Sequence, residues 1–153
     1  MAIFEAGATK TTAATPGTII AVIVPATLGS GVAPPEVREI GVFNVTGIAC
    51  EVGIGIPAAA GTGALTSVTV QDISNFGRTG HTLLGTSYAT TNPTAPTVFF
   101  RRAEIQAVVG AGIIWTWAPG EWPLWAGATV STPVIWQISA LAVGLDIYLK
   151  CSE

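Results

Sequence analysis

Charged residues are scarce in this sequence. Only 10% of the 153 residues are charged and 50% are hydrophobic, whereas about a quarter of a typical soluble domain is charged. Because charged side chains keep a monomer soluble, we expect partners or copies of the same chain to cover much of the surface. The net charge is −3 and Arg101–Arg102 is the only basic cluster. This argues against nucleic-acid binding, which requires a basic stripe facing the phosphates.

Histidine occurs once, as His81, and this scarcity removes most schemes of acid–base or nucleophilic catalysis. The sequence has no Gly-x-Ser-x-Gly elbow, no phosphate-binding loop and no Cys-x-x-Cys pair. One histidine and two cysteines are too few for a metal site built from these residues, so no metal or cofactor is expected. The acidic residues are numerous enough to supply a carboxylate pair for glycoside hydrolysis, such as Glu36 with Glu39 or Glu51 with Asp72. We expect them to be ordinary surface acids, and we expect no enzymatic activity.

Cysteine is also rare: Cys50 and Cys151 are the only two, about a hundred residues apart. This spacing is not a disulfide framework, and we expect two reduced thiols packed in the interior. The sequence shows no basic and apolar pattern of a secretion signal. Its best apolar run begins at Thr18 and stops at Pro25, well short of the roughly 20 residues of a membrane-spanning helix. We therefore expect a chain that is made in the cytoplasm and has no membrane partner.

Glycine and proline are plentiful, with 18 and 10 residues, as is common in turn-rich β proteins. From Gly17 onward, short apolar runs recur at intervals of about eight to twelve residues, with turn signals between them. The pattern predicts an all-β fold without helices, an antiparallel β-sandwich of about eight to ten short strands in two sheets of about four. A jelly roll fits this number of strands, and an immunoglobulin-like sandwich fits nearly as well, although its Cys…Trp…Cys core is not matched. The expected strands span residues 18–24, 37–45, 48–56, 65–73, 97–101, 104–109, 112–117, 124–130, 134–139 and 145–149.

The first residues of the chain differ in composition from the rest. Residues 1–16 are small, rich in Thr and Ala, and end at a proline. They predict an extended N-terminal arm, whereas residues 17–153 predict a single β-sandwich domain. Ile3 and Phe4, two large apolar residues of this arm, are candidates for contacts with a partner.

Two connections and one long irregular segment are also predicted. Thr46–Gly47 is typical of a tight hairpin turn between the strands on either side of it. The last two expected strands, 134–139 and 145–149, are predicted to form a terminal hairpin. Residues 74–96 are rich in Ser, Asn, Gly, Thr and Pro and predict the longest surface loop, with a short strand around Leu83 at most.

Tryptophan is concentrated in the last third of the chain. Trp115, Trp117 and Trp136 lie in expected strands, and we predict that they pack in the core. Trp122 and Trp125 follow a Pro-Gly turn and are predicted to anchor a subunit interface. A sugar-stacking platform is the alternative for this pair, but it normally needs polar neighbours, and Pro, Leu, Ala and Gly surround these two residues.

Within Phe99-Phe100-Arg101-Arg102, the two arginines are a second candidate for an interface, whereas one phenylalanine on each face of the strand predicts an ordinary two-sided core. The two arginines can pair with carboxylates of a neighbouring subunit, because the guanidinium fork suits interfacial acids. A solvated strand edge is the alternative.

The last third of the chain resembles small structural proteins encoded in tailed-bacteriophage virion gene clusters. The resemblance rests on Phe99-Phe100-Arg101-Arg102, on Gly110-Ala111-Gly112-Ile113-Ile114-Trp115-Thr116-Trp117 and on the closing pair of strands. The resemblance is strongest over residues 97–150. It implies a virion component without enzymatic residues, most like a capsid decoration (cement) protein. Such proteins are commonly compact β domains, often trimeric, that bind the major capsid protein on the capsid exterior after synthesis in the host cytoplasm. A tail or head-fibre subunit and a glycan-binding jelly roll are the alternatives.

Overall fold

The computed structural model describes residues 3–14, 18–25, 36–73, 79–121 and 133–152, with some residues of 18–25 and 79–83 described as backbone only. These residues form ten strands and no helix. Nothing in this described part is a helix of the length and hydrophobicity needed to cross a membrane. The strands are β1 (Ile3–Thr11), β2 (Thr18–Pro25), β3 (Glu36–Asn44), β4 (Cys50–Pro57), β5 (Leu65–Asp72), β6 (Thr79–Tyr88), β7 (Pro96–Ile105), β8 (Gly112–Thr116), β9 (Val134–Gln137) and β10 (Gly144–Ser152).

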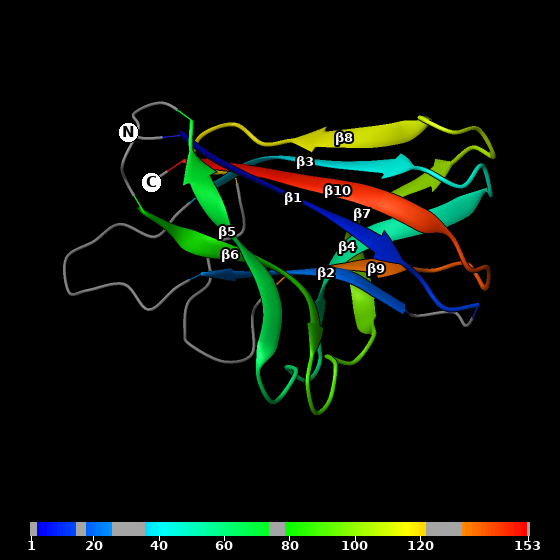
Figure 1. Cartoon of the computed structure of the whole chain (residues 1–153), viewed down its shortest axis with the longest axis horizontal. Coiled ribbons are helices and arrows are strands. Elements are labelled where there is room, and N and C mark those ends of the chain that lie inside the picture. Colours follow the sequence, from blue (N-terminus) through cyan, green and yellow to red (C-terminus); the bar gives the residue numbers. More distant parts are fainter. Residues whose placement is uncertain (1–2, 15–17, 26–35, 74–78, 122–132, 153) are drawn as a thin grey trace.

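The strands follow one continuous order of antiparallel neighbours, β7-β4-β9-β2-β6-β5-β1-β10-β3-β8. Strands β1, β10, β3 and β8 form one sheet (Figure 1), strands β2, β9, β4 and β7 form the other, and the β5–β6 hairpin joins the two along one side. If that hairpin is set aside, the first strand pairs with the last, the second with the last but one, and so on inward to β4 with β7. This is the topology of a long hairpin rolled up on itself, the jelly roll. The predicted antiparallel, jelly-roll-like β-sandwich is confirmed.

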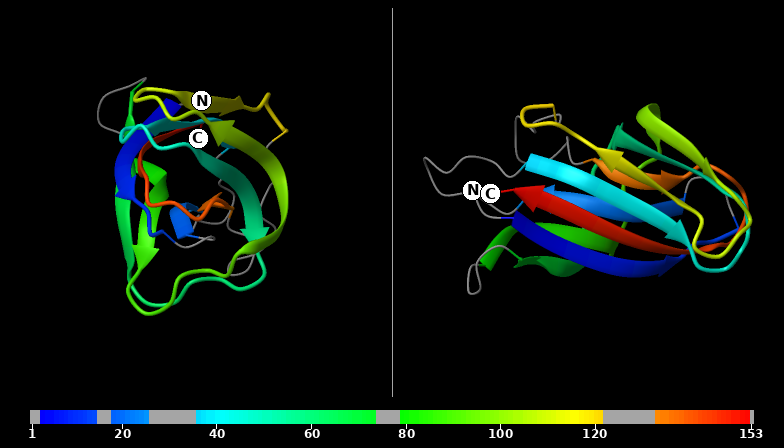
Figure 2. Two further views of the ribbon diagram at one scale, coloured as in Figure 1. Left: turned by 90° about the vertical axis from the view of Figure 1, so that its right-hand side faces the viewer. Right: turned by 90° about the horizontal axis from the view of Figure 1, so that it is seen from above.

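The core lies between the two sheets, which wrap around a shared interior (Figure 2). In β10, Leu145, Ile147 and Leu149 are buried while Asp146 and Tyr148 point outward, as the alternation predicts. The largest fully buried side chains come from both sheets, so one core serves the whole chain. They are Phe4, Ile20, Ile23, Ile40, Ile54, Leu84, Ile105, Ile135, Leu145, Leu149 and Gln137.

The three tryptophans predicted for the core are buried. Trp115 and Trp117 belong to the main core cluster. Trp136 lies on the other face of β9 with Val134, in a second cluster completed by Tyr88 and Phe99. β9 is therefore buried on both faces.

The N-terminal residues are extended but do not form an arm. β1 pairs with β10 along its whole length, from Ile3 opposite Ser152 to Thr11 opposite Gly144, and with β5 near its start. The prediction of an arm over residues 1–16 is therefore wrong for residues 3–11, and the domain includes them. Alanine, glycine and threonine give little hydrophobic alternation, so the sequence did not show that partners on both sides hold this strand.

Both predicted hairpins are wrong. Asn44 does organise a turn, since its Oδ1 accepts hydrogen bonds from the backbone N–H groups of Thr46 at 3.0 Å and Gly47 at 2.9 Å, and Gly47 has φ of +71°. However, β3 and β4 lie in different sheets, so this turn carries the chain across the sandwich. β9 and β10 also lie in different sheets. Turn residues set a change of direction and do not determine which strands pair.

The predicted loop over residues 74–96 contains a ten-residue strand, β6. It pairs with β5 and β2 and completes the link between the two sheets. The Thr, Gly and Ser in β6 hide the period-two pattern that identifies a half-buried strand. His81 lies in this strand, and its side chain is outside the described residues, as is the strand predicted over residues 124–130.

Candidate protein–protein interface

The open side of the sandwich lies between β7 and β8, the two ends of the strand order, which approach each other there. Among the described strands, β7 pairs only with β4 and β8 only with β3, so each presents one unpaired edge. The register of β7 against β4 shifts between Ile54 and Gly55, which leaves Phe100 as an extra residue. Bulges of this kind interrupt edge strands and hinder edge-to-edge pairing with other sheets.

Arg101 spans this open side. Its guanidinium carbon lies 5.9 Å from the centroid of the Trp117 ring, within cation–π distance. The Glu121 carboxylate accepts a hydrogen bond from the backbone N–H of Ala118 at 2.9 Å. Phe100, Arg101, Trp117 and Glu121 line a hollow of about 460 Å³, which we call the β7–β8 opening. The opening combines aromatic surface with one cation and one carboxylate.

Large apolar side chains are exposed on both edge strands and on the turn that joins them. Val98 of β7 is 71% exposed, Ile114 of β8 is 49% exposed, and Phe100 is 38% exposed. Val108 and Val109, in the turn between the two strands, are exposed as well. Exposed apolar side chains are a common feature of protein–protein contacts, which makes these strands a candidate interface.

Arg102 is held within the chain. Its Nε donates a hydrogen bond to Glu51 Oε1 at 3.0 Å, and its guanidinium carbon lies 5.8 Å from the Phe99 ring centroid. The pair is exposed, so it contributes little to stability. Arg101, by contrast, forms no ion pair within the described part of the chain. Of the two arginines, Arg101 is the one whose charge is available to a partner.

The other predicted interface residues do not gather at the opening. Ile3 is half-buried on β1, separated from β8 by β10 and β3, and its carbonyl accepts a hydrogen bond from the N–H of Ile73 at 2.9 Å. Phe4 is 2% exposed in the core, so its prediction as a contact residue is wrong. Trp122 and Trp125 follow Glu121 and lie outside the described residues.

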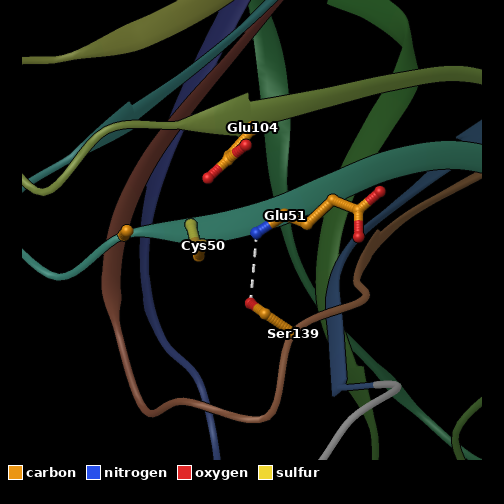
Figure 3. Close-up of a pocket in the computed structure, with 5 residues that line it drawn as sticks. Cys50, Glu51, Glu104 and Ser139 are labelled. Carbon is orange, nitrogen blue, oxygen red and sulfur yellow. Dashed lines mark hydrogen bonds between the residues drawn. The ribbon is translucent and has the colours of Figure 1, made fainter.

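A second hollow, of about 420 Å³, lies at β4 and β7 and is lined by Ala49, Cys50, Glu51, Glu104 and Ser139 (Figure 3). Glu51 and Glu104 are direct neighbours across the two strands. The Ser139 hydroxyl oxygen accepts a hydrogen bond from the backbone N–H of Glu51 at 3.1 Å. Burial raises the pKa of the Cys50 thiol, which keeps it protonated and a poor nucleophile. The contacts at this hollow are structural.

Cys50 and Cys151 are both buried thiols that form no disulfide, as predicted. The described residues contain no group of three or more His, Cys, Asp or Glu side chains placed to hold a metal ion.

The carboxylate pairs considered for hydrolysis are not assembled. Glu36 forms an ion pair with Arg38 at 2.7 Å, and Glu39 accepts a hydrogen bond from the Tyr148 hydroxyl at 2.5 Å. Glu51 and Asp72 lie on β4 and β5, which are far apart in the strand order. Glu39 and Glu51 instead link neighbouring strands, through Tyr148 of β10 and Arg102 of β7.

No protein-family model, curated protein or solved structure matches this chain. The jelly roll itself occurs in viral coat proteins, lectins and cupins. Because one fold serves many functions, the function has to be argued from the surface.

The sequence indicated part of the opening and missed the rest. Arg101 was predicted as an interface residue, whereas Phe100 was expected in a two-sided core and is instead 38% exposed. Glu121 was missed because an isolated acid after a Pro-Gly turn carries no pattern. Val98 was placed in a strand, but its exposure depends on β7 being an end strand, which the sequence does not show.

Proposed function

We propose that this chain is a non-enzymatic structural protein of a tailed-bacteriophage virion, which binds the outside of the assembled capsid and stabilises it. It acts as a trimeric decoration protein, and its β7–β8 opening contacts the major capsid protein or a neighbouring subunit. The observation that carries the proposal is the exposed apolar surface of the two edge strands, in a chain with only 10% charged residues. The jelly-roll topology supports it, since viral coat proteins commonly use this fold.

The mechanism is mass action. A subunit that binds only the assembled shell lowers the free energy of that state and so opposes its opening. Three linked copies bind more tightly than one, because the second and third contacts form at a high effective concentration. Since residues 3–11 are part of the sheet, attachment depends on the opening and its exposed apolar side chains rather than on an N-terminal arm.

The proposal is tested by native mass and by capsid binding. Size exclusion with light scattering at micromolar concentration is expected to give three times the mass of the chain. Co-sedimentation with capsids of the phage that encodes the chain is expected to show binding. Val98→Asp places a charge on the exposed apolar surface of β7, and we expect it to weaken capsid binding by about tenfold or more.

Val68→Asp is the matched control, because Val68 is also an exposed valine in a strand but lies on β5, away from the opening. It is expected to leave capsid binding unchanged. A monomer that does not sediment with capsids overturns the proposal. Equal loss of binding in both variants would show that the β7–β8 opening is not the capsid-binding surface. Binding to isolated tails instead of capsids would identify a tail subunit.

A further inference from the structure

The outer surface of the β1-β10-β3-β8 sheet carries an ordered group of side chains, of which the proposed function uses only Ile114. The register of the four strands sets three rows across this surface, and nearly all of the residues are exposed or half-buried. We call this surface the aromatic face. Its rows are Thr9-Asp146-Phe43-Gly112, Gly7-Tyr148-Gly41-Ile114 and Glu5-Lys150-Glu39-Thr116.

Two aromatic rings form the centre of the aromatic face. Phe43 and Tyr148 have ring centroids 6.1 Å apart, and their planes are inclined by 15°. Each ring occupies the space above a glycine of the neighbouring strand. A Cβ atom at Gly41 would lie 2.0 Å from Tyr148 Cε1, and one at Gly112 would lie 2.4 Å from Phe43 Cδ1. The two rings are thereby seated close to the sheet and nearly parallel.

Glycine also keeps the β1 side of the tyrosine open. A Cβ atom at Gly7, the neighbour of Tyr148 on β1, would meet only the Ile147 carbonyl oxygen, at 3.6 Å. The space above Gly7 is therefore free, with Glu5 and Thr9 on either side of it along the strand. A ring-shaped ligand can approach Tyr148 from this side.

Hydrogen-bonding groups surround the two rings. The Tyr148 hydroxyl donates to Glu39 Oε1 at 2.5 Å, and the Thr9 hydroxyl donates to Asp146 Oδ1 at 2.5 Å. Each carboxylate keeps a second oxygen and further lone pairs for a ligand. Lys150 lies between Glu5 and Glu39 in the register and supplies donors. Acceptors and donors therefore both border the aromatic centre.

We propose that the aromatic face binds neutral pyranose sugars of a glycan. The C–H groups on one side of a pyranose ring carry slight positive charge and pack against the negative face of an aromatic ring. The hydroxyl groups at the rim of the sugar both donate and accept, which matches the carboxylates, Lys150 and the threonine hydroxyls around Phe43 and Tyr148. Apolar surface with a few placed polar groups is the usual composition of a small-ligand site.

The charges on the aromatic face select the class of sugar. Three carboxylates, those of Glu5, Glu39 and Asp146, face one ammonium group, that of Lys150. The net negative charge repels uronic and sialic acids. A cationic partner such as an arginine-rich peptide would meet Lys150, a like charge, and would leave that donor without an acceptor. A neutral sugar meets neither obstacle.

This inference goes beyond the proposed function, because a capsid-binding subunit needs no sugar site. The two surfaces share only the side chain of Ile114, since the aromatic face lies on the outer side of one sheet and the hollow of the β7–β8 opening lies between the two edge strands. Either activity can fail without the other, so each has its own readout.

The test uses the full chain and calorimetric titration with maltohexaose, cellohexaose and mannohexaose, with hexagalacturonate as the anionic comparison. We expect at least one neutral oligosaccharide to bind and hexagalacturonate not to bind. Phe43→Leu keeps an apolar side chain above Gly112 but removes the aromatic ring. It is expected to weaken sugar binding by about tenfold.

Phe99→Leu is the matched control, because Phe99 is a half-buried phenylalanine that also packs over a glycine, Gly53, but lies in the other sheet. It is expected to leave sugar affinity unchanged. If Phe43→Leu does not fold, Asp146→Asn replaces it, since Asp146 is exposed and the amide keeps the shape of the carboxylate. We expect Asp146→Asn to weaken binding several-fold.

Several results overturn the inference. They are no binding of any neutral oligosaccharide at millimolar concentration, equal affinity for hexagalacturonate, and equal losses in Phe43→Leu and Phe99→Leu. Binding of an arginine-rich peptide to the same face, in the absence of sugar binding, also overturns it and assigns the face to a basic protein partner.

Discussion

Gly41 is the position where one added methyl group tests the arrangement of the outer sheet surface. An alanine Cβ there would lie 2.0 Å from Tyr148 Cε1, 2.6 Å from Cδ1 and 2.7 Å from Cζ. These distances are far below van der Waals contact, so the tyrosine ring has to leave its place. When it leaves, the hydrogen bond from its hydroxyl to Glu39 at 2.5 Å is lost.

The size of the effect follows from two opposing contributions. A hydrogen bond to a charged group is worth about 1.5–3 kcal/mol, and a half-buried one lies at the lower end of this range. Replacing glycine by alanine in an unobstructed strand stabilises the fold by about 0.5–1 kcal/mol. We therefore expect Gly41→Ala to lower the free energy of unfolding by about 1–2 kcal/mol once the displaced ring contact is included. At this chain length, each kcal/mol corresponds to a Tm lower by about 2–4 °C.

A double-mutant cycle separates the ring contact from other effects of the substitution. In a Tyr148→Ala background the obstacle is gone, and Gly41→Ala is expected to stabilise the protein by about 0.5–1 kcal/mol. Gly7→Ala is the matched control in the wild-type background, because its Cβ has only an ordinary contact at 3.6 Å. Chemical denaturation measures all four variants. If Gly41→Ala costs the same with and without the Tyr148 ring, the reasoning is refuted.

Three further predictions concern single side chains. Burial, together with the hydrogen bond to Glu39 and its negative charge, raises the pKa of Tyr148 to about 12 from 10.0. The folded state thus favours the protonated phenol, and the contribution of this group to the free energy of unfolding is complete below about pH 10 and is lost as the pH rises towards 12. Denaturation measured against pH is expected to show this loss in the wild type and not in Tyr148→Phe. Asn44→Ala removes donors to the Ile48 and Gln106 carbonyls, at 2.6 and 3.1 Å, and is expected to destabilise by about 2–4 kcal/mol in urea titration; a change below about 0.5 kcal/mol contradicts the structural role. Phe4→Ala is expected to lower the free energy of unfolding by about 3–5 kcal/mol in the same assay, because Phe4 is buried, and Ile3→Ala by less than about 1.5 kcal/mol. Equal losses in the two variants would contradict the placement of β1.

The sequence by itself determined the local properties of this protein. The alternation of Leu145, Ile147 and Leu149 identifies one face of a strand, because side chains of an extended chain point to alternate sides. The burial of Trp115 and the reduced state of Cys50 follow from residue type and neighbourhood. The all-β class follows from the same local signals, although they missed the strands β1 and β6.

Only the tertiary structure decided which strands are neighbours. The turn at Thr46–Gly47 has the same local chemistry whether it closes a hairpin or crosses between sheets, and pairing over long sequence separation chose the crossing. Pairing with β10 along its whole length, and with β5 near its start, makes a strand of the weakly patterned residues 3–11. The same pairing sets Tyr148 beside Gly41, more than a hundred positions earlier, and so forms the aromatic face. Contacts of this range depend on the register of whole strands, which no short stretch of sequence encodes.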